Sequence, residues 1–64
     1  MKLKYDREVD ILYIRLNDSP TKESDEDHPG ILLDYDDNGQ IVGIEIMNAS
    51  KRNIQPTKLE LEIL

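Results

Sequence analysis

The sequence predicts a mainly β fold, an antiparallel β-meander of four to five short strands that forms one small domain over residues 1–64. Three observations predict it. Apolar side chains recur at every second position in several short runs, an Asn-Gly pair separates two of these runs, and segments rich in Pro, Gly, Asn and Asp separate the others. We also expect one short helix near residues 48–53 and a C-terminal strand.

The first two runs predict a β-hairpin. Apolar and polar residues alternate over residues 1–6, and Leu12, Ile14 and Leu16 alternate with Tyr13 and Arg15 after a short polar connection. An antiparallel pairing of Leu3 with Ile14 and of Tyr5 with Leu12 places the apolar residues of both runs on one face. The segment Asn17–Pro20 is a dense turn signal that ends this hairpin.

Residues 21–28 allow two interpretations, a polar edge strand or a loose loop. They contain no apolar residue and four carboxylates, Glu23, Asp25, Glu26 and Asp27. The Pro29-Gly30 pair that follows suits the two central positions of a type II turn. The simplest register with the next strand would set Asp25 opposite Asp34, and opposed like charges are destabilising. We therefore expect a bulge, a different neighbour or disorder in this segment.

Residues 31–47 match two patterns. As a motif, they carry the fixed positions of an EF-hand calcium loop, at Asp34, Asp36, Asn38, Gly39 and Glu45. As a hairpin, they form two alternating strands around a type I′ turn at Asn38-Gly39. In that register three apolar pairs share one face: Ile31 with Ile46, Leu33 with Ile44, and Tyr35 with Val42.

The hairpin is the stronger interpretation. A calcium-binding EF-hand needs a helix on each side of its loop, whereas the flanks here are rich in β-branched residues and follow Pro29-Gly30. The hairpin also places Glu45 and Asp34 at diagonal positions on neighbouring strands, which is too far apart for both to bind one Ca²⁺ ion tightly. We therefore expect no metal site and no cofactor. Any Ca²⁺ association would be weak and would involve Asp34, Asp36, Asn38 and Glu45.

The C-terminal part predicts a short helix and then a strand. Asn48 suits an N-cap, and Lys51 and Arg52 lie near the end of the helical segment, where the helix dipole favours cations. Pro56 prevents a longer helix. Residues 58–64 alternate between apolar and polar positions, which favours a strand and leaves a helix open in so short a run.

Composition limits both the core and the partners. A chain of 64 residues without Phe, Trp or Cys builds a thin core, so we expect it to self-associate, most simply as a homodimer. Its net charge of −6 disfavours nucleic acid and anionic membranes and favours a basic partner. The lack of cysteine and of an apolar N-terminal run favours a cytoplasmic protein.

The sequence indicates binding rather than catalysis. His28 is the only histidine and lies next to the acidic segment, so no base is evident for a nucleophile. The three glycines are too scattered for a phosphate-binding loop. We therefore expect no enzyme activity and no catalytic residues.

Several segments, taken in order, resemble domain-of-unknown-function family 2283, a family of short bacterial proteins. The resemblance covers roughly residues 2–52 and rests on five segments: Lys4-Tyr5-Asp6, residues 10–16, residues 29–36, Asn38-Gly39, and residues 42–46 with Ala49-Ser50. His28 stands where the family pattern would place an apolar residue. The resemblance implies no catalytic residues. It also implies small toxin-like proteins as neighbours, and hence an antitoxin-like role.

These observations predict a small acidic protein-interaction domain that binds a basic partner, such as a toxin-like protein, or itself. The partner-binding residues would be Glu23, Asp25, Glu26 and Asp27, with hydrogen bonds from an exposed strand edge. The alternative is a structural, homo-oligomerising protein with weak Ca²⁺ binding at the loop from Asp34 to Glu45. In that case the acidic residues would only protect the sheet edge from aggregation.

Overall fold

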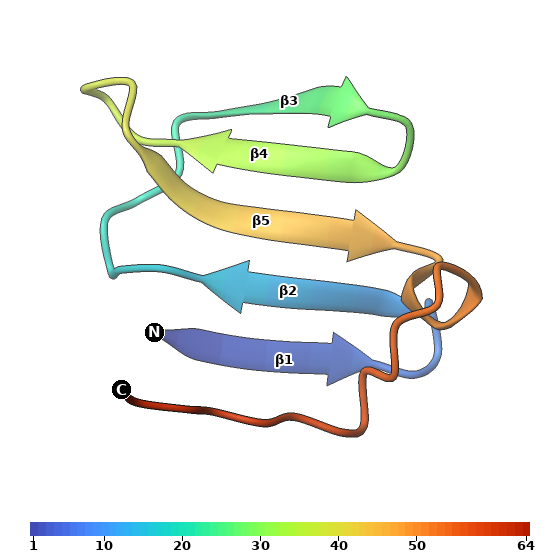
Figure 1. Cartoon of the computed structure of the whole chain (residues 1–64). Coiled ribbons are helices and arrows are strands. Elements are labelled where there is room, and N and C mark those ends of the chain that lie inside the picture. The colour runs from blue at the N-terminus through green and yellow to red at the C-terminus, as the bar shows by residue number, and fades with distance from the viewer.

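The computed structural model describes all 64 residues and contains one open sheet of five antiparallel strands, which confirms the mainly β prediction. One short 3₁₀ helix follows the last strand. The elements are β1 (Lys2–Asp6), β2 (Ile11–Arg15), β3 (Glu23–His28), β4 (Ile31–Tyr35), β5 (Ile41–Met47) and η1 (Ala49–Lys51). The strands lie side by side in the order β1-β2-β5-β4-β3 (Figure 1).

The strand order combines a meander with one crossover. β3, β4 and β5 follow one another as consecutive neighbours, but β2 lies next to β5 rather than next to β3. This arrangement pairs Leu12 with Ile46 and Ile14 with Ile44, so the apolar β5 occupies the centre of the sheet. The polar β3 lies at an edge, where charged side chains remain hydrated.

The first hairpin has the predicted register. Leu3 pairs with Ile14 and Tyr5 pairs with Leu12 across β1 and β2. Residues 7–10 form the connection, and Asp10 at its end has a φ of 57°. The apolar residues of both strands therefore share one face, as their alternation predicted.

The acidic segment forms an edge strand with a bulge. β3 pairs with β4 so that Ser24 is opposite Asp34 and Asp25 is opposite Leu33. The register shifts between Glu26 and His28, which confirms the expected bulge and removes the carboxylate opposition of the simplest pairing. Gly30 in the following turn has a φ of 79°, as position three of a type II turn requires.

The hairpin of β4 and β5 is confirmed, but its turn differs from the prediction. Asn38 has no positive φ, and only Gly39 does, at 73°. The Asp36 carboxylate oxygen Oδ1 accepts hydrogen bonds from the backbone N–H groups of Asn38 (2.9 Å) and Gln40 (3.0 Å). The Gly39 N–H also donates to the Asp36 carbonyl at 3.1 Å. These bonds produce a three-residue loop with a type I turn, and the predicted type I′ turn is wrong.

The changed loop moves the register at one end of this hairpin. Ile31 pairs with Ile46 and Leu33 with Ile44, as predicted, but Tyr35 pairs with Ile41 instead of Val42. The extra residue makes a bulge, and the Val42 carbonyl accepts a hydrogen bond from the Leu16 N–H on the other side at 2.8 Å. Val42 is completely buried.

The helix near residues 48–53 is present as the single 3₁₀ turn η1, but Asn48 does not cap it. Asn48 is left-handed, with a φ of 53°, and its side chain makes no capping hydrogen bond. Asp10 supplies the acceptors instead, because the β1–β2 connection reaches the start of η1. Arg52 then donates hydrogen bonds to the carbonyls of Met47 (2.8 Å) and Pro29 (2.5 Å). No helix in the chain is long and apolar enough to cross a membrane.

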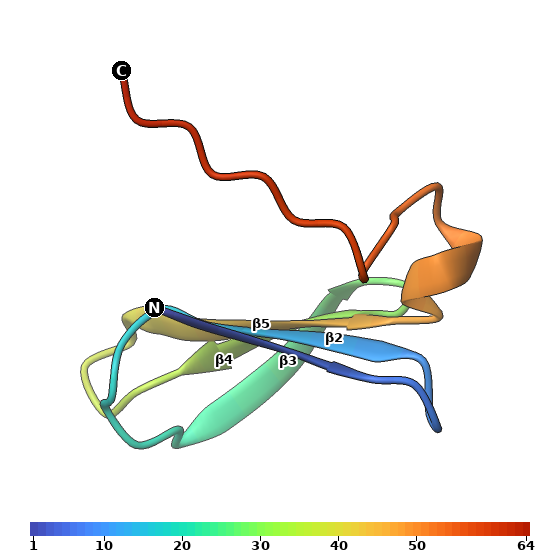
Figure 2. The same ribbon diagram turned by 90° about the horizontal axis from the view of Figure 1, so that it is seen from below.

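The predicted C-terminal strand is wrong. Residues 58–64, named here the C-terminal arm, belong to neither a strand nor a helix. They run extended on one side of the sheet and away from it (Figure 2). Leu59, Leu61 and Ile63 are 70%, 80% and 87% exposed. Alternation makes the segment suitable for a strand, but no sheet edge lies within hydrogen-bonding reach of it in the single chain.

The sheet has one apolar and one polar face, because successive side chains point to opposite sides. The apolar face consists of Leu3, Tyr5, Leu12, Ile14, Ile31, Leu33, Tyr35, Ile44 and Ile46. The polar face carries Lys4, Tyr13, Arg15, Ser24, Asp34, Gly43 and Glu45, together with the apolar Ile11, Leu32 and Met47. Only four of the 64 residues are buried, so most of the apolar face has no covering layer.

Candidate functional site

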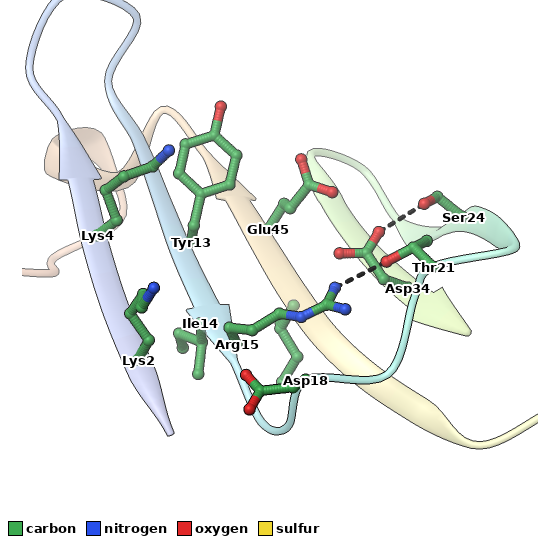
Figure 3. Close-up of a pocket in the computed structure, with 11 residues that line it drawn as sticks. Lys2, Lys4, Tyr13, Ile14, Arg15, Asp18, Thr21, Ser24, Asp34 and Glu45 are labelled. Atoms are coloured by element: carbon green, nitrogen blue, oxygen red, sulfur yellow. Dashed lines mark hydrogen bonds between the residues drawn. The ribbon is translucent and has the colours of Figure 1, made fainter. Parts of the chain in front are cut away.

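The largest concavity lies on the polar face (Figure 3). This polar basin has a volume of about 610 Å³ and receives side chains from all five strands. It is lined by Lys2, Lys4, Tyr13, Ile14, Arg15, Asp18, Thr21, Ser24, Asp34, Ile44 and Glu45. Cations from β1 and β2 lie on one side of it, and the carboxyl groups of β4 and β5 lie on the other.

Gly43 creates space for a buried carboxyl group in the basin. It lies between Arg15 on β2 and Asp34 on β4. A Cβ atom at Gly43 would lie 2.9 Å from Asp34 Oδ2, so the absent side chain leaves room for that carboxyl group. Asp34 is only 7% exposed, and its Oδ1 accepts a hydrogen bond from the Ser24 hydroxyl at 2.5 Å.

Glu45 lies beside Asp34 in the basin. Burial raises the pKa of Glu45 above its ordinary value, and hydrogen bonding with Asp34 and the charge of Asp34 raise it further. Two neighbouring carboxyl groups repel each other when both are ionised. The pair is therefore a source of strain at neutral pH rather than a source of stability.

We expect Glu45→Gln to stabilise the chain at neutral pH by a few tenths of a kcal/mol, since the partial exposure of Glu45 screens its charge. The folded-state pKa is raised, so the cost of ionised Glu45 is fully present above that pKa and disappears as the pH falls below the ordinary value. Urea unfolding of both proteins at pH 7 and at about pH 4 measures this difference. Glu62→Gln in the exposed arm is the control. A gain that persists at the lower pH would contradict the assignment.

The cations of the basin differ in how they are held. Arg15 donates hydrogen bonds to the carbonyls of Asn17 (2.9 Å) and Ser19 and to the Thr21 hydroxyl (2.7 Å), so it orders the connection from β2 to β3. The Lys4 ammonium group lies 4.9 Å from the centre of the Tyr13 ring, a cation–π contact. The basin can bind polar groups by charge and hydrogen bonding, and His28 is not part of its lining.

The four predicted partner-binding residues lie together on β3, at the edge of the sheet. Glu23, Asp25, Glu26 and Asp27 are all exposed. Glu26 Oε2 accepts a hydrogen bond from the Gly30 N–H at 3.1 Å. None of the four forms an ion pair within the chain, where the one ion pair joins Lys22 to Asp37 at 4.0 Å.

The structure adds two carboxylates to this set that the sequence interpretation missed. A shallow depression of about 320 Å³ brings Glu23 and Asp25 next to Asp36 and Asp37, with Lys22 as its only cation. We name the six carboxylates the acidic edge: Glu23, Asp25, Glu26, Asp27, Asp36 and Asp37. The proximity of the two segments depends on the β3–β4 register, which no local sequence pattern specifies.

The four calcium candidates do not form one ligand set. Asp34 and Glu45 are neighbours in the polar basin, whereas Asp36 and Asn38 lie in the β4–β5 turn, where Asp36 Oδ1 binds two backbone N–H groups. No group of three or more His, Cys, Asp or Glu side chains in the chain is arranged to hold a metal ion.

A second polar cluster lies at the opposite end of the strands and was missed from the sequence. Asp10 Oδ1 accepts hydrogen bonds from the Tyr5 hydroxyl (2.6 Å) and the Ser50 N–H (3.0 Å), and Oδ2 accepts one from the Ser50 hydroxyl (2.7 Å). The hydrogen bond from Tyr5, followed by those from Ser50, lowers the pKa of Asp10. The bond to Asp10 raises the pKa of Tyr5. This Asp10 cluster joins the first hairpin to η1 and is structural.

Known proteins match the part of the chain that contains the five strands. The model of a family described as a protein of unknown function, DUF2283, matches residues 2–50. An uncharacterised protein of Methanocaldococcus jannaschii is 45% identical over 51 residues, which cover 80% of this chain. The matched region spans only 43% of that archaeal protein. No solved structure matches the chain.

Proposed function

The chain belongs to the DUF2283 family, and on that premise we propose that it is a protein-interaction domain that binds a basic partner protein at its acidic edge. The role is antitoxin-like: the domain covers a basic functional surface of a small protein in the cytoplasm and thereby blocks it. It acts by binding and not by catalysis. The single observation that supports the proposal most is the exposed edge strand β3, which is paired on one side only and carries four carboxylates.

The backbone of β3 offers hydrogen bonds to a partner strand. β3 pairs with β4 on one side only, and its other side has no neighbouring strand. All six of its residues are exposed. An extended segment of a partner can therefore add to the sheet by backbone hydrogen bonds, which is a recurring mode of peptide recognition.

The charge of the edge favours a basic partner. The net charge of the chain is −6, and the depression beside β3 contains four carboxylates and one lysine. None of the carboxylates on β3 is neutralised by an ion pair within the chain. Complementary charge steers association and discriminates between partners.

Reversal of the edge charges tests the proposal. We expect the triple variant Glu23→Lys, Asp25→Lys and Asp27→Lys to bind a basic strand partner at least about 100-fold more weakly, because three attractive contacts become repulsive. The probe is a peptide with alternating Lys and Val. Calorimetry at two salt concentrations measures the affinity.

A matched variant separates binding at this edge from general charge attraction. Glu8→Lys, Glu60→Lys and Glu62→Lys change the net charge by the same amount away from the edge, and circular dichroism checks that both variants fold. The control is expected to retain most of the affinity. Equal losses in both variants, or unchanged binding together with aggregation of the edge variant, would support protection of the edge from aggregation instead.

A further inference from the structure

The isolated chain exposes more surface than a folded monomer of its size. Its accessible surface is 5219 Å², whereas a compact protein of 7.4 kDa exposes about 4,200 Å². The excess, about 1,000 Å², is close to the roughly 800 Å² that each partner buries in a protein–protein interface of standard size. The amount of surplus surface therefore corresponds to one interface for each chain.

The surplus is located on one side of the molecule. The apolar face carries aliphatic or aromatic side chains from β1, β2, β5 and β4, and the C-terminal arm lies on the same side. Leu3, Tyr5 and Leu12 of that face line a groove of about 290 Å³ together with residues of the chain leading into the arm, Ile54, Gln55, Pro56, Lys58 and Leu59. The arm itself then runs off without covering the rest of the face (Figure 2).

The molecule also lacks the second layer that a stable domain needs. Its extents are 32 × 32 × 19 Å, and the arm rises from the plane of the sheet (Figure 2). A sheet with one apolar face is normally packed against a second sheet or a helical layer. Nothing else in the 64 residues can supply that layer, because all other segments are strands of the same sheet or short connections.

We propose that a second copy of this chain supplies the missing layer, with the two apolar faces packed against each other and each C-terminal arm lying on the other copy. A second copy fits because the centre of the face carries no charged side chain, so two chains of net charge −6 can meet there. Glu23 and Asp25 border the face at β3, which matches the polar rim typical of interfaces.

The dimer leaves the free backbone edge of β3 open to a partner strand, while Glu23 and Asp25 of the acidic edge lie at the rim of the dimer interface. Two sheets packed face to face form a sandwich about 10 Å between layers. The strand edges of such a sandwich stay at its sides, so β3 of each copy remains accessible. The dimer and the proposed partner binding can therefore fail separately.

The solution mass tests the dimer directly. We expect sedimentation equilibrium of the full chain between about 1 μM and 1 mM to give twice the monomer mass of 7.4 kDa over most of that range. Leu3→Glu, on the apolar face and 39% exposed, is expected to raise the dimer Kd at least about 100-fold. Lys2→Gln lowers the net charge by the same amount on the opposite face of β1 and is expected to leave the Kd unchanged.

Variants of the arm keep the test valid if Leu3→Glu unfolds the chain, since the arm belongs to no strand and its apolar side chains are largely exposed in the single chain. Leu59→Ser, Leu61→Ser and Ile63→Ser together are expected to raise the dimer Kd at least about 10-fold. Glu60→Ser and Glu62→Ser, on the alternate positions of the same arm, are the control and are expected to preserve the dimer. A wild-type chain that stays monomeric at every concentration, or an arm variant with an unchanged Kd, would overturn the proposal.

Discussion

Gly43→Val is expected to destabilise the chain by about 2–4 kcal/mol. The new Cβ atom would lie 2.9 Å from Asp34 Oδ2 and 3.4 Å from the Ile14 carbonyl oxygen. Asp34 is buried and hydrogen-bonded to Ser24, so moving its carboxyl group breaks that bond and leaves a buried polar group without its partner. Because a chain of 64 residues has a total stability of roughly 3–10 kcal/mol, the loss is a large part of it.

A double-mutant cycle isolates the cause of this loss. In an Asp34→Ala background the side chain that blocks the Cβ atom is gone, so we expect Gly43→Val to cost less than about half as much there as in the wild type. The higher strand propensity of Val then also offsets part of the remaining clash. Urea unfolding measures all four proteins. The same cost in both backgrounds would show that Asp34 is not the obstacle.

The parts of the fold that the sequence predicted are those set by neighbouring residues. The pairing of Leu3 with Ile14 and of Leu33 with Ile44 follows from alternation and from the short connections between the strands. Electrostatics argued against the regular register, which would have opposed two carboxylates, and the bulge near Asp27 is one of the three outcomes that this left open. Such arguments need only side-chain period and charge.

The parts that it missed depend on contacts between distant segments or on a competing local bond. Alternation places Ile44 and Ile46 on one face but does not say that β2 is their neighbour. The turn changed because the Asp36 carboxylate binds the Asn38 N–H, which stabilises a type I turn in place of the type I′ turn. The C-terminal arm alternates as a strand does, yet it makes no backbone hydrogen bonds to the free edge of β1.

The candidate site divides in the same way. The concentration of charge on Glu23, Asp25, Glu26 and Asp27 was visible in the sequence, and the structure places all four at an exposed edge. Their proximity to Asp36 and Asp37 appears only once β3 and β4 are paired. The same holds for the Asp10 cluster, in which Asp10 and Ser50 are forty positions apart.

The hydrogen bonds of the Asp10 cluster are expected to stabilise the folded chain. We expect Asp10→Ala to lower the Tm by roughly 10 °C at neutral pH, because three hydrogen bonds to a carboxylate are lost together. The folded-state pKa of Asp10 is lowered, so its contribution is present above the ordinary pKa of Asp and is lost as the pH falls through the lowered value. The part of the difference that comes from the carboxylate should therefore disappear in acid.

Two further variants separate the carboxylate from the backbone. Asp10 has a φ of 57°, so Asp10→Ala adds backbone strain as well as removing hydrogen bonds. Asp10→Gly removes the same hydrogen bonds without that strain. We expect its difference in Tm from the wild type to be present at neutral pH and to disappear in acid. Ser50→Ala keeps Asp10 and the bond from Tyr5 and should cause a smaller loss. If Asp10→Gly unfolds at the wild-type Tm at neutral pH, the hydrogen bonds from Tyr5 and Ser50 do not hold η1 against the sheet. The hydrogen bonds from Arg52 to the carbonyls of Met47 and Pro29 would then hold this part of the chain instead.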